Sequence, residues 1–456
     1  MDLLCGAYGV PSDEENEGQA PLPAPVAKKA RSEGCPRRTE PPFPAVLRRP
    51  IGHGLAPAPT KLPPAEGRYI SKRERAILAA AAASASASAS FSSSGQGAAR
   101  PSPLLSTSVM NPGLTAVGSI SDLDIPHDVL SALRHPAKDR VKHLKGSIKH
   151  PVVLSSHTKA VNALQWSRNH MHLLASASMD QTVCVWNVWS RENKKVARIF
   201  THHNAAVKDV RWSPEGLSLL SCGYDCCSRL VDVENGIQRQ LFKEDQVVGV
   251  VKFHPDNHNL FLSGGSKGSL RLWDIRTGNV AQEYVKPLGP IFDVEFSTDA
   301  RHLISSSDVS KSNASENSII VWDVSRQIPL SNQVYVEAYT CPCIRYHPSD
   351  ACFVAQSNGN YIAIFSARPP FKLDRYKRYE KHAVSGFPIK CNFSLDGNEL
   401  ASGSADGCIY FYNYTSAELV RKLRAFEEPC TDVAYHPVLP GVIAACGWNG
   451  EVSVFQ

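Results

Sequence analysis

The sequence predicts an all-β fold, a seven-bladed β-propeller preceded by a largely disordered N-terminal region. Three observations support this prediction. A pattern of short runs rich in β-branched and aromatic residues recurs seven times over residues 149–456. Its copies lie roughly 41 to 50 residues apart, close to the length of a four-stranded blade. Residues 1–148 are instead rich in proline, alanine and serine.

The clearest copy lies between His157 and Asn187. It contains the runs Val161–Trp166, Leu173–Ser178 and Val183–Trp186, which turn residues separate, so that consecutive antiparallel strands are predicted. The next run, Val196–Phe200, predicts a fourth strand that leads into the second copy.

The seven copies stay in register along the chain. Their predicted first strands end at Trp166, Trp212, Phe253, Phe296, Tyr346, Phe393 and Tyr435. Their predicted third strands end at Trp186, Val231, Trp273, Trp322, Phe365, Tyr412 and Phe455. One copy would be weak evidence for a propeller, whereas seven in register predict one closed domain over residues 149–456.

The last copy reaches Gln456 with three predicted strands. Pro151–Leu154 precedes His157 in the way that Ala197–Phe200 precedes the histidines at 202 and 203. We therefore expect strand 151–154 to complete the last blade. This pairing would join the two ends of the propeller and remove an exposed strand edge.

The third-strand runs VCVWN, LRLWD and IVWD resemble those of the WD-repeat family. Blades of this family often hold a buried network of Trp, Ser or Thr, Asp and His, in which a carboxylate and an imidazole satisfy each other. The matching residues are His157, Ser176, Asp180 and Trp186 in one copy, and His382, Ser402, Asp406 and Tyr412 in another. Other copies depart, with Lys267 and Glu316 at the Asp position and Val231 at the Trp position.

Longer strings are similar to a branch of this family that includes a spliceosomal protein. They are Phe253–Phe261, Trp273–Gly278, Ala355–Asn360, Ser402–Gly407 and Ala445–Gly450. The resemblance covers the predicted propeller and does not extend to the N-terminal third. It implies a non-catalytic protein-interaction scaffold in nuclear ribonucleoprotein or pre-mRNA splicing assemblies.

The family resemblance also leaves an alternative function open. Trp273-Asp274-Ile275-Arg276 matches the W-D-x-R sequence of family members that act as substrate receptors of cullin–RING ubiquitin ligases. In those proteins the arginine meets an adaptor, which makes Arg276 the candidate contact. The fuller motif has an acidic residue near the preceding turn, where this chain has Lys267. The W-D-x-R sequence is also common across the WD-repeat family, because its residues suit the turn that follows a third strand.

A partner-binding face is expected at the turns between second and third strands. The residues before the recurring turn position are Met179, Tyr224, Ser266, Ser315, Asn358, Ala405 and Trp448. Met179, Tyr224, Asn358 and Trp448 are the candidates for partner binding, and the large side chains among them are good interface anchors. The alternative is that these side chains pack against neighbouring loops.

The N-terminal region holds the whole net charge. Residues 1–150 contain 19 Lys/Arg and 13 Asp/Glu, and 18 of the 32 prolines. Such a segment buries too little apolar surface to order itself. Lys28–Arg31 with Arg37-Arg38 has the form of a nuclear-import signal. Segments 72–83 and 122–133 are expected to form short helices or to fluctuate.

Other chemistry is not favoured by the sequence. Gly264–Gly268 has the letters of a nucleophile elbow, but it lies between two predicted strands of one blade, so no enzyme activity is expected. No paired CxxC or HExxH spacing predicts a metal, and no cofactor is expected. No apolar run is long enough for a membrane span.

Partners should be proteins or peptides, with RNA reached only through ribonucleoprotein assembly or the basic tail. An intracellular location is expected, with the nucleus favoured over the cytoplasm.

Overall fold

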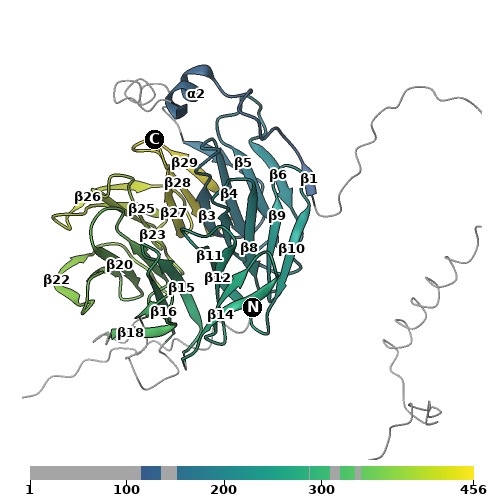
Figure 1. The fold of residues 1–456 in the computed structure, drawn as a ribbon. Coiled ribbons are helices and arrows are strands. Elements are labelled where there is room, and N and C mark those ends of the chain that lie inside the picture. Colours follow the sequence, from purple (N-terminus) through teal and green to yellow (C-terminus); the bar gives the residue numbers. More distant parts are fainter. Residues whose placement is uncertain (1–113, 135–150, 287, 309–318, 334–339) are drawn as a thin grey trace, which may run out of the picture. The chain divides into compact units, whose positions relative to one another are not determined.

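The computed structural model describes residues 114–134, 151–286, 288–308, 319–333 and 340–456. These residues form seven antiparallel sheets, called blades 1 to 7 in chain order, and one helix (Figure 1). The predicted all-β propeller is therefore confirmed. No helix in this described part of the chain is long and apolar enough to cross a membrane.

Blades 1 to 3 follow one another without interruption. Blade 1 contains β3 (Val161–Trp166), β4 (Leu173–Ser178), β5 (Val183–Asn187) and β6 (Val196–Phe200). Blade 2 contains β7 (Val207–Trp212), β8 (Ser218–Gly223), β9 (Cys227–Asp232) and β10 (Gln238–Lys243). Blade 3 contains β11 (Val248–Phe253), β12 (Leu260–Gly265), β13 (Leu270–Asp274) and β14 (Asn279–Tyr284).

Blades 4 to 7 complete the set. Blade 4 contains β15 (Ile291–Phe296), β16 (His302–Ser307), β17 (Ile319–Asp323) and β18 (Ile328–Gln333). Blade 5 contains β19 (Cys343–Tyr346), β20 (Cys352–Ser357), β21 (Tyr361–Ser366) and β22 (Leu373–Tyr379). Blade 6 contains β23 (Cys391–Phe393), β24 (Glu399–Ser402), β25 (Cys408–Asn413) and β26 (Leu419–Arg424). Blade 7 contains β27 (Cys430–Tyr435), β28 (Ile443–Gly447), β29 (Val452–Phe455) and β2 (Val152–Leu154).

The second and third strands are buried on both faces because each blade packs between two others. Every residue of β4 and of β5 is buried, which explains their nearly continuous apolar runs. The largest fully buried side chains include Trp186 and Trp322, each in a third strand. Apolar packing between blades thus supplies the core.

The ring is closed by pairing between its two ends. The first strands of successive blades contact one another in turn, from β3 to β27, and β27 contacts β3 again. β2 pairs antiparallel with β29, and Val152 lies opposite Val454. Leu154 is buried in the cluster between blades 1 and 7. Residues early in the propeller therefore form the outer strand of its last blade.

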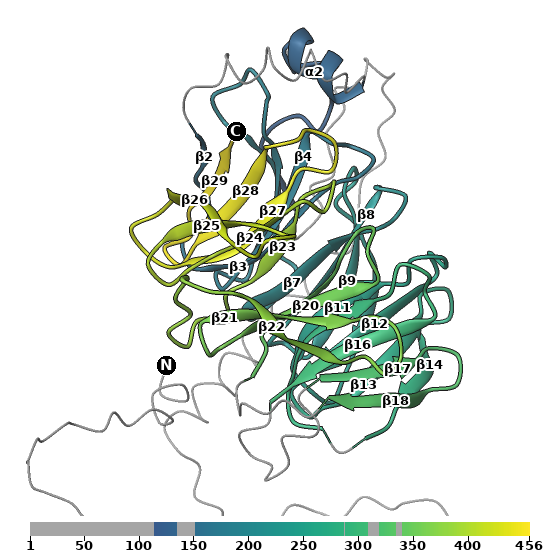
Figure 2. The same cartoon turned by 90° about the vertical axis from the view of Figure 1, so that its left-hand side faces the viewer.

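Ordered structure begins earlier than the predicted boundary at residue 149. β1 (Leu114–Ala116) pairs with β6 as a fifth strand of blade 1, and α2 (His127–Arg134) follows. We call residues 114–134 the strap. Val129, Ala132 and Leu133 of α2 join the apolar cluster of blades 1 and 7, beside which Figure 2 places the helix. For residues 114–134 the assignment to a disordered region is thus wrong.

The helix in the strap is shorter than the expected segment 122–133. Ile125 precedes Pro126, and a residue before proline disfavours the helical conformation. The helix accordingly begins after the proline, while Asp122 accepts a hydrogen bond from Arg134 at 2.5 Å. The other expected helix, 72–83, lies outside the described residues, as do Lys28–Arg31 and Arg37-Arg38.

Candidate interaction face and central channel

The network expected in blade 1 forms a continuous hydrogen-bonded chain. The Trp186 indole N–H donates to Ser176 Oγ at 2.8 Å, and Ser176 Oγ lies 2.7 Å from His157 Nε2. His157 Nδ1 lies 2.9 Å from Asp180 Oδ2. Burial lowers the pKa of His157, but the hydrogen bonds and charges of Asp180 and Cys184 together outweigh burial and raise the pKa to about 9. This network ties β4 and β5 to the loop before β3 and to the turn between β4 and β5.

Blade 6 does not repeat this arrangement. His382 Nδ1 lies 2.9 Å from the Tyr412 hydroxyl, and its Nε2 lies 2.6 Å from the side-chain amide of Gln356 in blade 5. Asp406 instead accepts from Tyr410 at 2.9 Å and pairs with Lys422 at 2.8 Å. The expected His382–Asp406 hydrogen bond is replaced because Tyr410 and Lys422 engage the carboxylate. Burial lowers the pKa of His382 to about 4, so this imidazole is neutral.

Blade 2 holds a second histidine–carboxylate pair that the sequence analysis did not single out. His203 Nδ1 lies 2.9 Å from Asp225 Oδ2, and its Nε2 lies 2.8 Å from Ser221 Oγ. Arg229 donates to the same carboxylate at 2.9 Å. The signal was present, since His203 and Asp225 occupy the positions of His157 and Asp180. Val231 at the Trp position obscured it.

The described residues that follow the second strands make the same kind of contact in each blade. A backbone N–H donates at 2.7 to 3.0 Å to a carbonyl in the segment that precedes the first strand of the same blade. The donors are Met179, Tyr224, Ser266, Asp308, Asn358, Ala405 and Trp448. The turns after the second strands and the starts of the first strands therefore share one face, which we call the turn face. Ser315 lies outside the described residues, and Asp308 holds its position in blade 4.

The candidate residues of the turn face differ in exposure. Tyr224 is 48% exposed, whereas Met179, Asn358 and Trp448 are half-buried. Trp448 packs edge-on against Phe387 of a neighbouring loop at 5.2 Å between ring centroids. Asn358 donates to the Thr340 hydroxyl at 2.5 Å. Tyr224 is thus the most accessible anchor, and Trp448 partly serves loop packing.

Aspartates on three first strands connect neighbouring blades. Asp209, Asp293 and Asp432 each precede a valine and accept the N–H of that valine. Each also accepts a backbone N–H from the first strand of the next blade. The donors are Val251 at 3.3 Å, Ile344 at 3.0 Å and Leu164 at 3.0 Å. The repeated Asp-Val pair was the sequence signal for these contacts, which sequence reasoning missed.

The same strands bring charged side chains into the centre of the ring. Arg345 pairs with Asp293 at 2.6 Å, Lys252 with Glu295 at 2.5 Å, and Arg211 with Asp209 at 2.9 Å. Lys390 pairs with Asp432 at 3.5 Å. We call these eight residues the channel network. Burial opposes ionisation of Asp293, but the Arg345 and Lys252 charges hold its pKa well below the usual range.

Arg276 lies in the turn after β13. Its side chain is 67% exposed and pairs with Asp274 at 2.8 Å. Lys267 pairs with Asp245 at 3.0 Å. Ser266, the central residue of Gly264–Gly268, lies in the turn between β12 and β13, where its hydroxyl accepts the Val247 N–H at 3.2 Å. Arg276 is therefore accessible, but its charge is already matched by an adjacent carboxylate.

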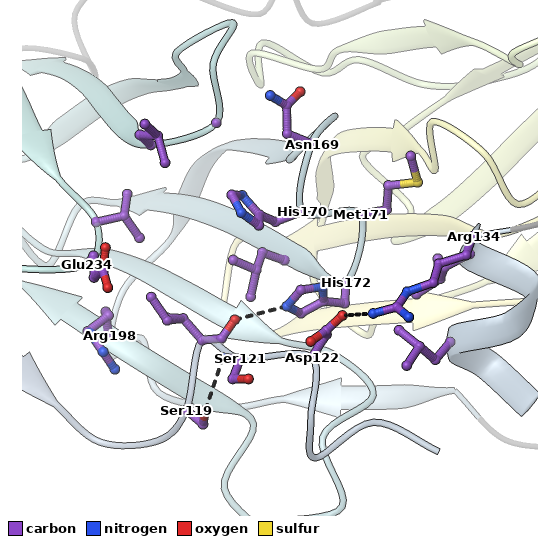
Figure 3. Close-up of a pocket in the computed structure, with 17 residues that line it drawn as sticks. Ser119, Ser121, Asp122, Arg134, Asn169, His170, Met171, His172, Arg198 and Glu234 are labelled. Carbon is purple, nitrogen blue, oxygen red and sulfur yellow. Dashed lines mark hydrogen bonds and ion pairs between the residues drawn. The ribbon is translucent and has the colours of Figure 1, made fainter. Parts of the chain in front are cut away.

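A cavity of about 660 Å³ lies between the strap and the turns of blades 1 and 2 (Figure 3). His172 bonds the Ile120 carbonyl at 3.0 Å, and the Asp122–Arg134 pair lies at its side. Arg198 donates to the Gly118 carbonyl at 2.6 Å. The polar groups drawn at this cavity thus mainly hold the strap on the blades. Among the described residues, no cluster of three or more His, Cys, Asp or Glu could hold a metal ion.

The comparisons with known proteins agree with this architecture. A family model described as WD domain, G-beta repeat matches residues 149–187, 194–232, 239–274 and 375–413. These segments fall on blades 1, 2, 3 and 6. The chain is therefore a seven-bladed β-propeller in which four segments match the WD-repeat model. The blades without a match contain departures such as Cys343-Ile-Arg-Tyr346, yet they pair in the same strand order.

The propeller is similar to WD repeat-containing protein 25 of Mus musculus, with 37% identity over 305 residues. That alignment covers 66% of this chain and 57% of the relative. Pre-mRNA-processing factor 17 of Mus musculus is 30% identical over 338 residues, covering 74% of this chain and 56% of that protein. The protein of the same name from Saccharomyces cerevisiae is 24% identical over 302 residues, covering 65% and 64%. The chain thus spans somewhat more than half of the length of these relatives.

Proposed function

We propose that this chain is a protein-interaction scaffold that binds a protein or peptide partner on the turn face and acts in nuclear pre-mRNA processing assemblies. The observation that carries the proposal is the turn face itself. Six turns, and Asp308 at the start of the blade 4 turn, are held by the same kind of backbone hydrogen bond, so the described part of the face should lose little conformational entropy on binding. Tyr224 presents an exposed aromatic anchor there.

The role in pre-mRNA processing assemblies is proposed from the names of similar proteins. Two similar proteins are named for pre-mRNA processing, and their alignments cover 74% and 65% of this chain. A nuclear location follows from the same proposal. The channel network supports a binding role over catalysis, since its acids and bases neutralise one another in pairs. RNA would then be contacted through the assembled partners.

Co-purification of the intact chain from nuclear extract tests this function. The unchanged chain should enrich splicing proteins, and Tyr224→Ala should reduce that enrichment at least about fivefold, as expected for loss of an interface anchor. Leu395→Ala is the matched control, because Leu395 is 60% exposed and lies in the turn after β23, away from the turn face. Equal enrichment by Tyr224→Ala and by the unchanged chain would show that the partner does not bind through Tyr224 on the turn face.

The ubiquitin-ligase alternative rests on the exposure of Arg276 and is tested in the same experiment. A receptor would enrich a cullin adaptor, and Arg276→Ala would abolish that enrichment. The scaffold proposal expects Arg276→Ala to leave the enriched proteins unchanged. Loss of an adaptor with this variant would favour the receptor.

A further inference from the structure

The charges of the innermost strands do not cancel. The first strands and the residue before β23 carry five cations, Lys208, Arg211, Lys252, Arg345 and Lys390. They carry four carboxylates, Asp209, Asp293, Glu295 and Asp432. Each carboxylate pairs with a cation other than Lys208. One positive charge is therefore left over within the described part of the ring.

Lys208 carries this surplus charge. It has no ion-pair partner among the described residues, and the aromatic ring of Tyr224 lies 5.8 Å from its ammonium group. The neighbouring Asp209 forms no ion pair with Lys208, because that carboxylate pairs with Arg211 and accepts the Val210 and Val251 N–H groups. An enclosed ammonium without a counter-charge is costly, and an incoming anion would relieve that cost.

Lys208 lies on the turn face. It is the second residue of β7, two residues after the carbonyl of Ala206 that accepts the Tyr224 N–H. Lys208 thus offers a cation without an ion-pair partner among the described residues, beside the exposed aromatic ring of Tyr224.

The electrostatic environment of Lys208 also favours the binding of an anion. Burial, and after it the positive charge of Lys390, lowers the pKa of Lys208 to about 8. Lys390 itself donates to the Asn162 carbonyl at 2.8 Å, so its ammonium is held inside the ring. A bound carboxylate would oppose both effects and restore a fully charged ammonium.

We propose that Lys208 binds an aspartate or glutamate side chain of a partner peptide, with an adjacent apolar side chain packed on Tyr224. The inference rests on the proposed function, because it assumes that the partner binds the turn face. It adds the chemistry of the residue recognised: an acidic residue next to an apolar one.

Selection from a random heptapeptide library displayed on phage, against the intact chain, tests the proposal. Selected peptides should be enriched in Asp or Glu beside an apolar residue. Binding of a synthetic selected peptide, followed by fluorescence anisotropy, should weaken about tenfold or more with Lys208→Met, which keeps the length of the side chain. Lys194→Met is the control, since Lys194 is an exposed lysine in the loop between β5 and β6, on the side opposite to the turn face, and should leave the affinity unchanged.

The outcomes separate this inference from the proposed function. Weaker binding with Tyr224→Ala but unchanged binding with Lys208→Met would keep the turn face and reject the anion site. Unchanged binding with both variants would reject both. A uridine oligonucleotide that binds more tightly than any selected peptide, and depends on Lys208, would replace the acidic peptide with RNA phosphate. Acidic peptides whose binding depends on Lys208 and Tyr224 together would support both proposals.

Discussion

Lys390 of blade 6 donates from its ammonium group to the carbonyl oxygen of Asn162 in blade 1, at 2.8 Å. The side chain thereby reaches past blade 7, whose Asp432 it also pairs with at 3.5 Å. Burial disfavours the charge, yet Asp432 and the other nearby carboxylates raise the pKa of Lys390 above its usual value. One side chain thus connects three blades at the point where the ring closes.

Lys390→Met should lower the free energy of unfolding by about 3–5 kcal/mol, because Asp432 would be left buried without its counter-charge. Chemical denaturation of the purified chain measures this change. Lys422→Met is the control, since the exposed Lys422–Asp406 pair should contribute little. Equal losses in the two variants would show that the connection through Lys390 does not stabilise the ring.

Ring closure by β2 predicts a contrast between two neighbouring residues. Leu154 is 1% exposed and Val153 is 52% exposed, although both pair with β29. Leu154→Ala should cost about 2–5 kcal/mol through lost burial and a cavity, whereas Val153→Ala should change stability by less than about 1 kcal/mol. Thermal unfolding compares the two. Similar melting temperatures would mean that β2 contributes little to closure.

The His157–Asp180 pair predicts a loss of stability at alkaline pH. The pKa of His157 is raised from 6.5 to about 9 in the folded chain, so the pair contributes fully below pH 6.5. Its contribution should fall as the pH rises and be gone above about 9. Denaturation at several pH values between 6 and 10 measures this decline.

Two matched variants test whether the loss of stability at alkaline pH comes from the His157–Asp180 pair. Asp180→Asn should be less stable than the unchanged chain near pH 6 and should lose much of the alkaline decline. Asp406→Asn should keep the decline, because Asp406 is bonded to Tyr410 and Lys422 and not to a histidine. An unchanged pH profile in Asp180→Asn would refute the assignment.

The strap should stabilise blade 1. Leu133 is 5% exposed in the apolar cluster that includes Trp166 and Trp189, whereas Leu123 is 86% exposed. Leu133→Ala should cost about 2 kcal/mol or more and should speed hydrogen exchange of β6, which pairs with β1. Leu123→Ala should do neither. Unchanged exchange in Leu133→Ala would show that the strap is held independently of its helix.

Much of the propeller could be predicted from the sequence, because its strands repeat a local pattern of apolar runs and turns. The blade 1 network was predictable for the same reason, since His157, Ser176, Asp180 and Trp186 keep the family spacing. The side-chain network of blade 6 was predicted wrongly because Tyr410 and Lys422 bind Asp406 in place of His382. These contacts depend on how neighbouring strands are placed. A short helix was expected at 122–133, but the packing of the strap on the blades was missed, because its few apolar residues, such as Leu133, become buried only against blades 1 and 7.

The channel network could not be predicted because its partners come from different blades. Arg345 and Asp293 are 52 residues apart, and Lys390 and Asn162 are 228 apart. No local pattern relates such positions. The surplus charge on Lys208 follows only when the carboxylates of the ring have been assigned to their cations.

Hydrogen exchange of the purified chain, with and without a partner recovered from nuclear extract, tests the central claim that the turn face binds the partner. We predict slower exchange in the turns at Tyr224 and Trp448 and at the start of β7, with unchanged exchange around Arg276. Slower exchange confined to the turn at Arg276, or to the strap, with no change at Tyr224, would contradict the account.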